Sequence, residues 1–213
     1  MNTYMKTGIV LVLAVLVATL VIYPQLPQSI PTRWADDGGI SYGSKTTVFI
    51  LPAVMAATLL SFGLVLPWLS PKRFEVQTFW STYYFIMLMV LALTAYFHAM
   101  MLRAAWPGQI DAPRAMSAGV FVFLMLMGNV LGKVRRNFWI GVRTPWTLAN
   151  ERVWNATHRL AGWVFVLTGL LGLVAALAGL DLRIGLTLLV AAGVVVIVYS
   201  LVYYKRLERR GEL

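Results

Sequence analysis

Six long runs of apolar residues, separated by shorter polar segments, account for most of the chain. They cover approximately residues 7–23, 46–69, 81–102, 115–132, 160–180 and 183–204. Each run is close to the roughly 20 residues that a helix needs to cross a bilayer. The runs are continuously apolar, whereas membrane-spanning strands alternate, and a helix satisfies its backbone polar groups within the segment. The pattern predicts an all-α fold, an integral membrane bundle of six transmembrane helices.

The composition agrees with a membrane location. Hydrophobic residues make up 60% of the 213 residues and charged residues only 12%, whereas soluble domains carry roughly 25% charged residues. The chain has no cysteine, which excludes a disulfide framework and thiolate metal sites. No small-residue cleavage pattern precedes Tyr23-Pro24, so we interpret the first run as a retained helix and not as a signal peptide.

The cations are distributed unequally between the two sides of the predicted bundle. With the N-terminus in the cytoplasm, 13 of the 18 Lys and Arg residues fall on the cytoplasmic side and five on the outer side. Because cytoplasmic loops are enriched in Lys and Arg, both termini are predicted to be cytoplasmic. The net charge of +10 follows from this bias and suits contact with anionic lipid head groups. It gives no reason to expect a nucleic-acid partner.

Two connections are long enough to carry structure, the outer loop 24–45 and the inner loop 133–159. We interpret residues 1–213 as a single membrane domain, in which 1–69 form a helix pair with the outer loop and 81–204 carry the inner loop. The prolines of the outer loop restrict its backbone, and its Asp-Asp-Gly-Gly sequence indicates a turn. A compact folded outer loop is therefore expected.

The inner loop carries more charged and aromatic residues than a simple connection between helices needs. It carries six Lys or Arg residues, one Glu and three Trp. A Thr-Pro turn precedes Thr147, which we expect to cap a helix that starts at Leu148 and continues into the fifth transmembrane helix. On that helix Glu151, Asn155 and His158 fall on one face. Such a face either lines a cavity or meets water and lipid phosphate.

The two histidines do not indicate a shared metal or haem site. His98 lies near the outer end of the third predicted helix and His158 near the inner end of the fifth. At 1.5 Å per residue, we expect them to be roughly 20–25 Å apart along the membrane normal. His98 is interpreted as an interfacial or interhelical hydrogen-bonding residue, and a metal pair of His158 with Glu151 is a weaker alternative. We therefore expect no metal and no cofactor.

Catalytic patterns are missing from the sequence, which contains no Ser-His-Asp set, H-E-x-x-H motif or phosphate-binding glycine loop. Ionisable residues in the middle of the predicted helices are also essentially missing, although an ion-coupled transporter normally needs them. The missing catalytic motifs predict a protein that is not an enzyme, and the missing ionisable residues argue against ion-coupled transport. Small residues on the fifth helix, Gly169 and Gly172 among them, predict that it packs closely against a neighbour.

The inner loop carries a recognisable motif. Residues 137–148 read NFWIGVRTPWTL and are followed by Glu151, Trp154, Thr157-His158-Arg159 and Gly162. This motif resembles the signature of the SdpI family of membrane proteins, approximately N-x-x-I-G-[IV]-R-[TL]-P-W-T-L and then W-x-x-T-H-R-x-x-G. The outer loop, from Ile30-Pro31 to Lys45, resembles the N-terminal domain of unknown function often paired with this family. The resemblance covers nearly the whole chain and is more specific in the inner motif.

The resemblance implies a multi-pass protein of the bacterial inner membrane that protects a toxin-producing cell from its own secreted, membrane-active peptide. It also implies signal relay, because the family's name-giving protein holds a transcriptional repressor at the membrane. The implied partners are a toxin peptide and a cytoplasmic regulator protein, besides anionic lipid. The candidate binding residues of the inner segment are Asn137, Gly141, Arg143, Thr144, Pro145, Trp146, Glu151, Trp154, His158 and Arg159. Those of the outer loop are Pro31, Arg33, Trp34 and Asp36.

Several alternatives remain open at this point. The outer loop departs from the family pattern, since Arg33 stands where a His is usual and the Asp expected after the glycine is replaced or missing. The protein could instead be a small-molecule or peptide transporter with the inner motif as a gate, or a membrane-embedded hydrolase or metalloprotein. The inner motif could also be purely structural. In that case Arg143 and Arg159 bind lipid phosphate, Trp146 anchors the segment at the membrane interface, and Thr147 caps the following helix. The sequence leaves open whether the inner loop is a signalling end or the floor of a cavity.

Overall fold

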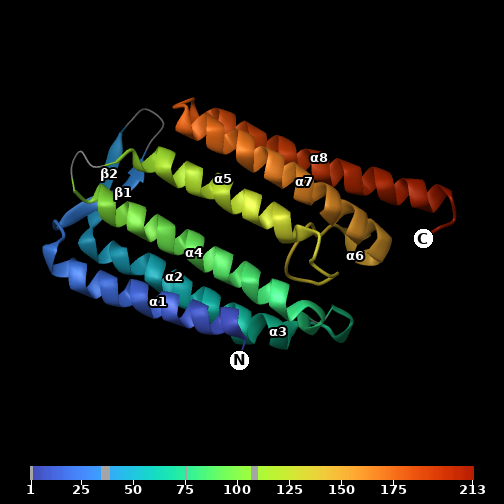
Figure 1. The fold of residues 1–213 in the computed structure, drawn as a ribbon, viewed down its shortest axis with the longest axis horizontal. Coiled ribbons are helices and arrows are strands. Elements are labelled where there is room, and N and C mark those ends of the chain that lie inside the picture. Colours follow the sequence, from blue (N-terminus) through green and yellow to red (C-terminus); the bar gives the residue numbers. More distant parts are fainter. Residues whose placement is uncertain (1, 35–38, 75, 107–109) are drawn as a thin grey trace.

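The helical spans of the protein lie side by side in one bundle (Figure 1). The computed structural model describes residues 2–34, 39–74, 76–106 and 110–213. Within these residues, six spans are long and apolar enough to cross a membrane, which confirms the predicted fold class. Their bounds are Thr3–Gln25, Lys45–Leu69, Val76–Ala104, Ala112–Leu131, Glu151–Leu177 and Leu182–Arg209.

The helical spans and the loops between them contain the following regular elements. They are α1 (Thr3–Ile22), β1 (Ser29–Trp34), β2 (Ile40–Ser44), α2 (Ile50–Leu60), α3 (Leu66–Leu69), α4 (Trp80–Ala104), α5 (Ala112–Leu131), α6 (Pro145–Ala149), α7 (Glu151–Leu177) and α8 (Leu182–Arg209). Both termini lie toward the same end as the loop between α5 and α6, and the two strands lie at the opposite end (Figure 1). We call these the inner end and the outer end, after the predicted orientation.

The second span bends where a proline interrupts it. Helix α2 passes through a π-helical turn at Ser61–Val65 before α3 begins, and the backbone N–H of Leu66 donates to the carbonyl of Ser61. Pro67 has no N–H to donate, and its ring crowds the carbonyl four residues earlier. The wider turn relieves this conflict, so α2 and α3 form a single bent span.

The closest helix pair is α5 with α7, as the small residues of α7 predict. The Cα of Gly128 on α5 faces Gly162 on α7 so closely that a Cβ at Gly128 would lie 2.6 Å from the Gly162 carbonyl oxygen. At Gly169 an added Cβ would lie 2.7 Å from the Phe121 carbonyl oxygen, and at Gly172 it would meet the Phe121 ring. Small residues allow such approach between helices in a membrane. The predicted close packing of the fifth span is confirmed.

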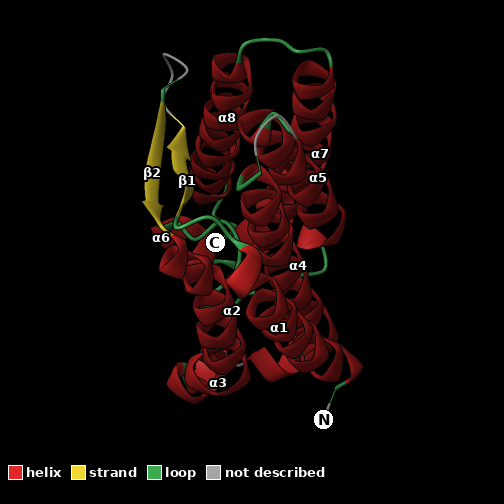
Figure 2. Ribbon diagram, turned by 90° about the vertical axis from the view of Figure 1, so that its left-hand side faces the viewer, coloured by secondary structure: helices red, strands yellow, loops and turns green. Residues whose placement is uncertain are grey.

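The outer loop folds into an antiparallel hairpin of β1 and β2, which lies at one edge of the bundle (Figure 2). Ile30 is fully buried and packs with Leu26, Val48 and Leu102, so the hairpin is fixed to the outer end of α4. The expectation of a compact loop is thus confirmed for its described residues.

The four outer candidate residues differ in their surroundings. Pro31 is buried beneath the hairpin, Trp34 is half-buried and Arg33 is exposed. Asp36 lies outside the described residues. Of the described candidates, Arg33 is therefore the one whose side chain is open to a partner, together with part of Trp34.

His98 joins two helices. Its Nε2 lies 2.8 Å from Oγ1 of Thr19 on α1, and the Thr19 hydroxyl donates to the carbonyl of Val15 at 2.7 Å. The hydroxyl proton is used by that carbonyl, so Thr19 accepts the proton of Nε2. This confirms His98 as an interhelical hydrogen-bonding residue.

Candidate functional site

The inner loop between α5 and α6 is organised around a buried amide. Asn137 is fully buried. Its Nδ2 donates to the carbonyls of Arg135 at 2.8 Å and Ile140 at 3.0 Å. Its Oδ1 accepts the backbone N–H groups of Trp139 and Ile140, each at 2.7 Å. One side chain thus satisfies four backbone groups, which leaves Asn137 no capacity for a ligand and makes it the centre of the loop.

The loop closes onto His158 at Gly141. The backbone N–H of Val142 donates to His158 Nε2 at 3.0 Å, and Nδ1 lies 2.8 Å from the carbonyl oxygen of Trp154. Because Nε2 accepts, Nδ1 carries the proton and donates to that carbonyl. Gly141 has φ +114°, and any Cβ there would collide with the imidazole ring. The glycine is required both by its backbone angle and by this close approach.

The hydrogen bonds of His158 contradict its alternative role in a metal pair. Both ring nitrogens are already engaged with the backbone, so no lone pair remains for a metal. Glu151, the proposed second ligand, is exposed at the start of α7 while His158 is buried. Within the described part of the chain, no group of three or more metal-binding side chains comes together.

The cap of the helix after the loop is Thr144, which corrects the expectation for Thr147. The Thr144 side chain accepts from the Thr147 backbone N–H at 3.3 Å, and the Thr147 hydroxyl accepts from the Thr144 N–H at 2.8 Å. This reciprocal capping box starts α6 at Pro145, a favoured first helical residue. Helix α6 then ends after one turn, and Asn150 caps α7 separately. The expected continuous helix from Leu148 is wrong, because a second cap interrupts it.

The three tryptophans of the segment each donate the indole N–H, two of them to other parts of the bundle and one within the loop itself. Trp139 Nε1 donates to Ser70 Oγ at the end of α3, at 2.8 Å. Trp146 Nε1 donates to Ser200 Oγ on α8, at 2.7 Å. Trp154 is fully buried, stacks on His158 with ring centroids 4.0 Å apart, and donates to the carbonyl of Val134 at 2.8 Å. These indole N–H groups hold the loop in place; Trp154 is fully buried, whereas Trp139 and Trp146 are half-buried.

Replacing Trp146 by Phe is expected to loosen α6 from α8. The change keeps most of the apolar contact but leaves the Ser200 hydroxyl without its donor, so it should cost about 1 kcal/mol of unfolding free energy. Unfolding of the detergent-solubilised protein would measure the loss. Trp163→Phe is the matched control, because Trp163 is 78% exposed on α7 and should change little. Equal effects of the two substitutions would mean that the Ser200 bond contributes nothing.

The charged candidates do not converge. Arg143 is exposed and donates to the carbonyl of Phe138. Glu151 and Arg159 are exposed on α7, whereas His158 on the same helix is buried. The expected polar face of Glu151, Asn155 and His158 is therefore divided, because the loop folds over its deeper part. Arg143, Glu151 and His158 lie in three different surroundings, which argues against a cavity floor built by them together.

A cationic cavity lies beside the loop. It measures about 520 Å³ and is lined by Gly132, Lys133, Val134, Arg135, Asn155 and Arg159. Arg159 also lines a neighbouring cavity of about 250 Å³ that reaches along α5 and α7 to Trp163. No carboxylate lines either cavity, so both favour an anion. Of the candidates named from the sequence, Arg159 alone takes part in them.

Some residues that position the loop were not indicated by the sequence. Arg136 donates to the carbonyls of Leu148 and Ala149, each at 3.2 Å, and so satisfies the end of α6. Ser70 and Ser200 receive the indole protons described above. The only signal for Arg136 was its place in a basic run, and the two serines lie in apolar stretches without any signal.

A family model described as the SdpI/YfhL protein family matches residues 133–204. This part of the chain is similar to the SdpI/YfhL family. The SdpI/YfhL match begins at Lys133 and so includes the whole inner loop with α6 and α7. A model described as a domain of unknown function, DUF1648, matches residues 10–56, which include the outer hairpin.

One relative is similar to this chain over almost its full length. The chain is 29% identical over 206 residues to the immunity protein SdpI of Bacillus subtilis (strain 168), covering 94% of this chain and 96% of that protein. No solved structure matches. The resemblance drawn from the sequence is confirmed, and the protein is an immunity-protein-like, multi-pass membrane protein.

Proposed function

We propose that this protein confers resistance to a membrane-active toxin peptide, as a non-enzymatic immunity protein of the bacterial inner membrane. The observation that carries the proposal is the similarity to an immunity protein over 94% of the chain. The family matches include both the outer hairpin and the inner loop. An immunity protein needs no catalytic group, and His158, the buried titratable side chain of the inner loop, is used in holding the fold.

We assign toxin contact to the outer hairpin. Its β2 strand presents Tyr42, which is 62% exposed, and the half-exposed Ile40, while β1 presents Arg33. Tyr42 and Ile40 lie on the same face of β2, whereas Arg33 pairs with Ser41 and lies on the other face. An exposed aromatic ring beside an exposed apolar side chain suits a peptide that itself has an apolar face. The hairpin is fixed below by Ile30, so this surface is held in one orientation.

We assign signal relay to the inner loop, which forms a fixed surface at the predicted cytoplasmic end. Its buried part is held by Asn137, His158 and three indoles, while Arg143, Glu151 and Arg159 remain exposed. A cytoplasmic regulator would therefore meet a rigid pattern of charges. Recognition of that pattern depends on complementary charge and is expected to weaken with salt.

The proposal predicts that a substitution in the outer hairpin lowers resistance to the toxin peptide. In a toxin-sensitive host, expression of the wild type should raise survival under peptide challenge. Tyr42→Ala should weaken peptide binding about tenfold, the size expected for an exposed aromatic anchor, and should lower survival accordingly. Leu180→Ala is the control, because Leu180 is also an exposed apolar residue, in the turn between α7 and α8.

The same assay separates resistance from relay. Arg143→Ala should leave survival near the wild-type level but reduce recruitment of a cytoplasmic protein to the membrane. Arg209→Ala, an exposed inner-end arginine on α8, serves as its control. If the wild type gives no survival advantage over an empty vector at equal membrane expression, the protein is not an immunity protein for that peptide class.

A further inference from the structure

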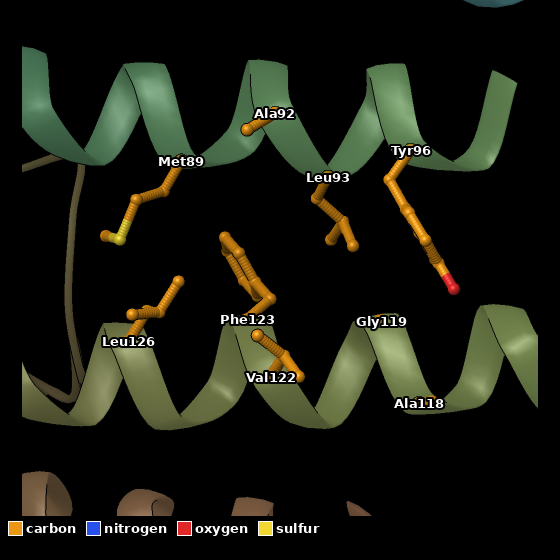
Figure 3. Close-up of a pocket in the computed structure, with 9 residues that line it drawn as sticks. All are labelled: Met89, Ala92, Leu93, Tyr96, Ala118, Gly119, Val122, Phe123 and Leu126. Carbon is orange, nitrogen blue, oxygen red and sulfur yellow. The ribbon is translucent and has the colours of Figure 1, made fainter. Parts of the chain in front are cut away.

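An apolar groove lies between α4 and α5. It encloses about 320 Å³, and Figure 3 shows side chains of both helices pointing into it. The lining residues that matter here are Met89, Ala92 and Leu93 on α4 and Val122, Phe123 and Leu126 on α5. Val122 and Leu126 are exposed, so the groove is open on the side that faces lipid.

The groove continues into a polar cavity at the inner end. Leu126 also lines a second cavity of about 370 Å³, with Ser81, Thr82, Asn129 and Lys133 among its walls. On α5 the wall residues 119, 122, 126 and 129 follow a spacing of three and four, which is one face of a helix, and Lys133 comes two residues after the helix ends. At 1.5 Å per residue the helical part of this stripe is about 15 Å long, and Lys133 extends it at the inner end. The two cavities thus form one track, polar at its inner end and apolar beyond it.

The outer end of the track is closed by Tyr96. Its hydroxyl donates to the carbonyl of Ala115 on α5 at 2.8 Å. Its ring lies against Gly119 so closely that a Cβ there would be 2.5 Å from the ring edge. An occupant therefore has its polar group at the inner end and its apolar part directed toward Tyr96.

The polar end of the track is cationic. Lys133 lines both this track and the cavity that holds Arg135 and Arg159. No carboxylate lines these cavities, and the ion pairs recorded between described residues all involve other cations. Hydroxyls of Ser81 and Thr82 stand on the opposite wall as hydrogen-bond donors. The group that fits here is an anion with oxygen acceptors, such as a phosphate.

We propose that this track binds one anionic phospholipid of the inner leaflet. The phosphate lies between Lys133 and the Ser81 and Thr82 hydroxyls, and one acyl chain follows the α5 stripe to Tyr96. The length agrees, because one leaflet contributes about 15 Å of hydrocarbon and the track adds its polar end. Lipid binding here does not depend on whether the protein confers immunity, so either conclusion can fail alone.

The test begins with protein purified in mild detergent and stripped of lipid. Native mass spectrometry during titration with phosphatidylglycerol should show one molecule bound more tightly than the rest. Phosphatidylcholine should bind at this site at least about fivefold more weakly, since each basic residue near a membrane surface contributes about 1 kcal/mol toward anionic lipid. Equal binding of the two lipids, or full competition by glycerol phosphate without acyl chains, would overturn the proposal.

Two variants with matched controls locate the site. Ala92→Phe fills the groove and should abolish the tight phosphatidylglycerol site, while Ala191→Phe places the same ring on the exposed surface of α8 and should retain it. Lys133→Gln should weaken binding about fivefold, whereas Lys6→Gln, an exposed inner-end lysine on α1, should not. If Ala92→Phe and Ala191→Phe retain the site equally, the groove is not where the lipid binds.

Discussion

Replacing Gly141 with alanine is expected to destabilise the protein by about 2–4 kcal/mol. Gly141 has φ +114°, an angle that disfavours any side chain. Its Cβ would collide with Nε2 of His158, the atom that accepts the Val142 N–H. The substitution therefore combines backbone strain with the loss of a hydrogen bond to a buried ring, whose nitrogen is then left unsatisfied.

Amide hydrogen exchange would detect this change locally, and unfolding in detergent would measure its size. We expect faster exchange at Val142 together with a lower unfolding temperature. Gly211→Ala is the matched control, since Gly211 also has positive φ, at +64°, but a Cβ there meets no atom within 4 Å. A Gly141→Ala protein with wild-type exchange at Val142 would show that the imidazole does not hold the loop.

The sequence predicts the six spans well for a physical reason. Each span must bury its own backbone polar groups and present apolar side chains to lipid, so its signal is local and continuous. The start of α7 is harder to predict, because Thr144, Thr147 and Asn150 are all capable of capping a helix. Which of them caps is decided by tertiary contacts, such as the bond from Trp146 to Ser200 that holds α6 against α8.

The roles of the site residues are less visible in the sequence than their identities. The motif drew attention to Trp154 and His158, but their partners are the carbonyl of Val134 and the N–H of Val142. Backbone groups leave no trace in a sequence pattern. Buried motif residues such as Trp154 and His158 thus hold the loop, and the exposed charges lie around them.

On the proposed function, this division lets a short loop carry both the motif and a surface for recognition. The buried side chains fix the backbone, so exposed residues such as Arg143 and Arg159 can change without altering the conformation of the loop. A rigid loop also presents its charges at little entropic cost on binding. Changes in the buried set should therefore impair folding, whereas changes in the exposed set should impair interaction.

Replacing Gly128 with alanine is expected to separate α5 from α7 and to cost up to about 3 kcal/mol. The added Cβ would lie 2.6 Å from the carbonyl oxygen of Gly162 and 2.9 Å from the backbone nitrogen of Val166. Backbone atoms cannot move aside as a flexible side chain can, so the helices themselves must shift. In lipid, close packing of this kind is a main source of helix association.

Denaturation of the reconstituted or detergent-solubilised protein would measure the loss at Gly128. Gly193→Ala is the matched control, because it makes the same change in a transmembrane helix where no atom lies within 4 Å of the new Cβ. There alanine should be neutral or slightly stabilising, since it favours the helix over glycine by up to about 1 kcal/mol. A Gly128→Ala protein as stable as the Gly193→Ala protein would mean that α5 and α7 do not meet at this point in the membrane.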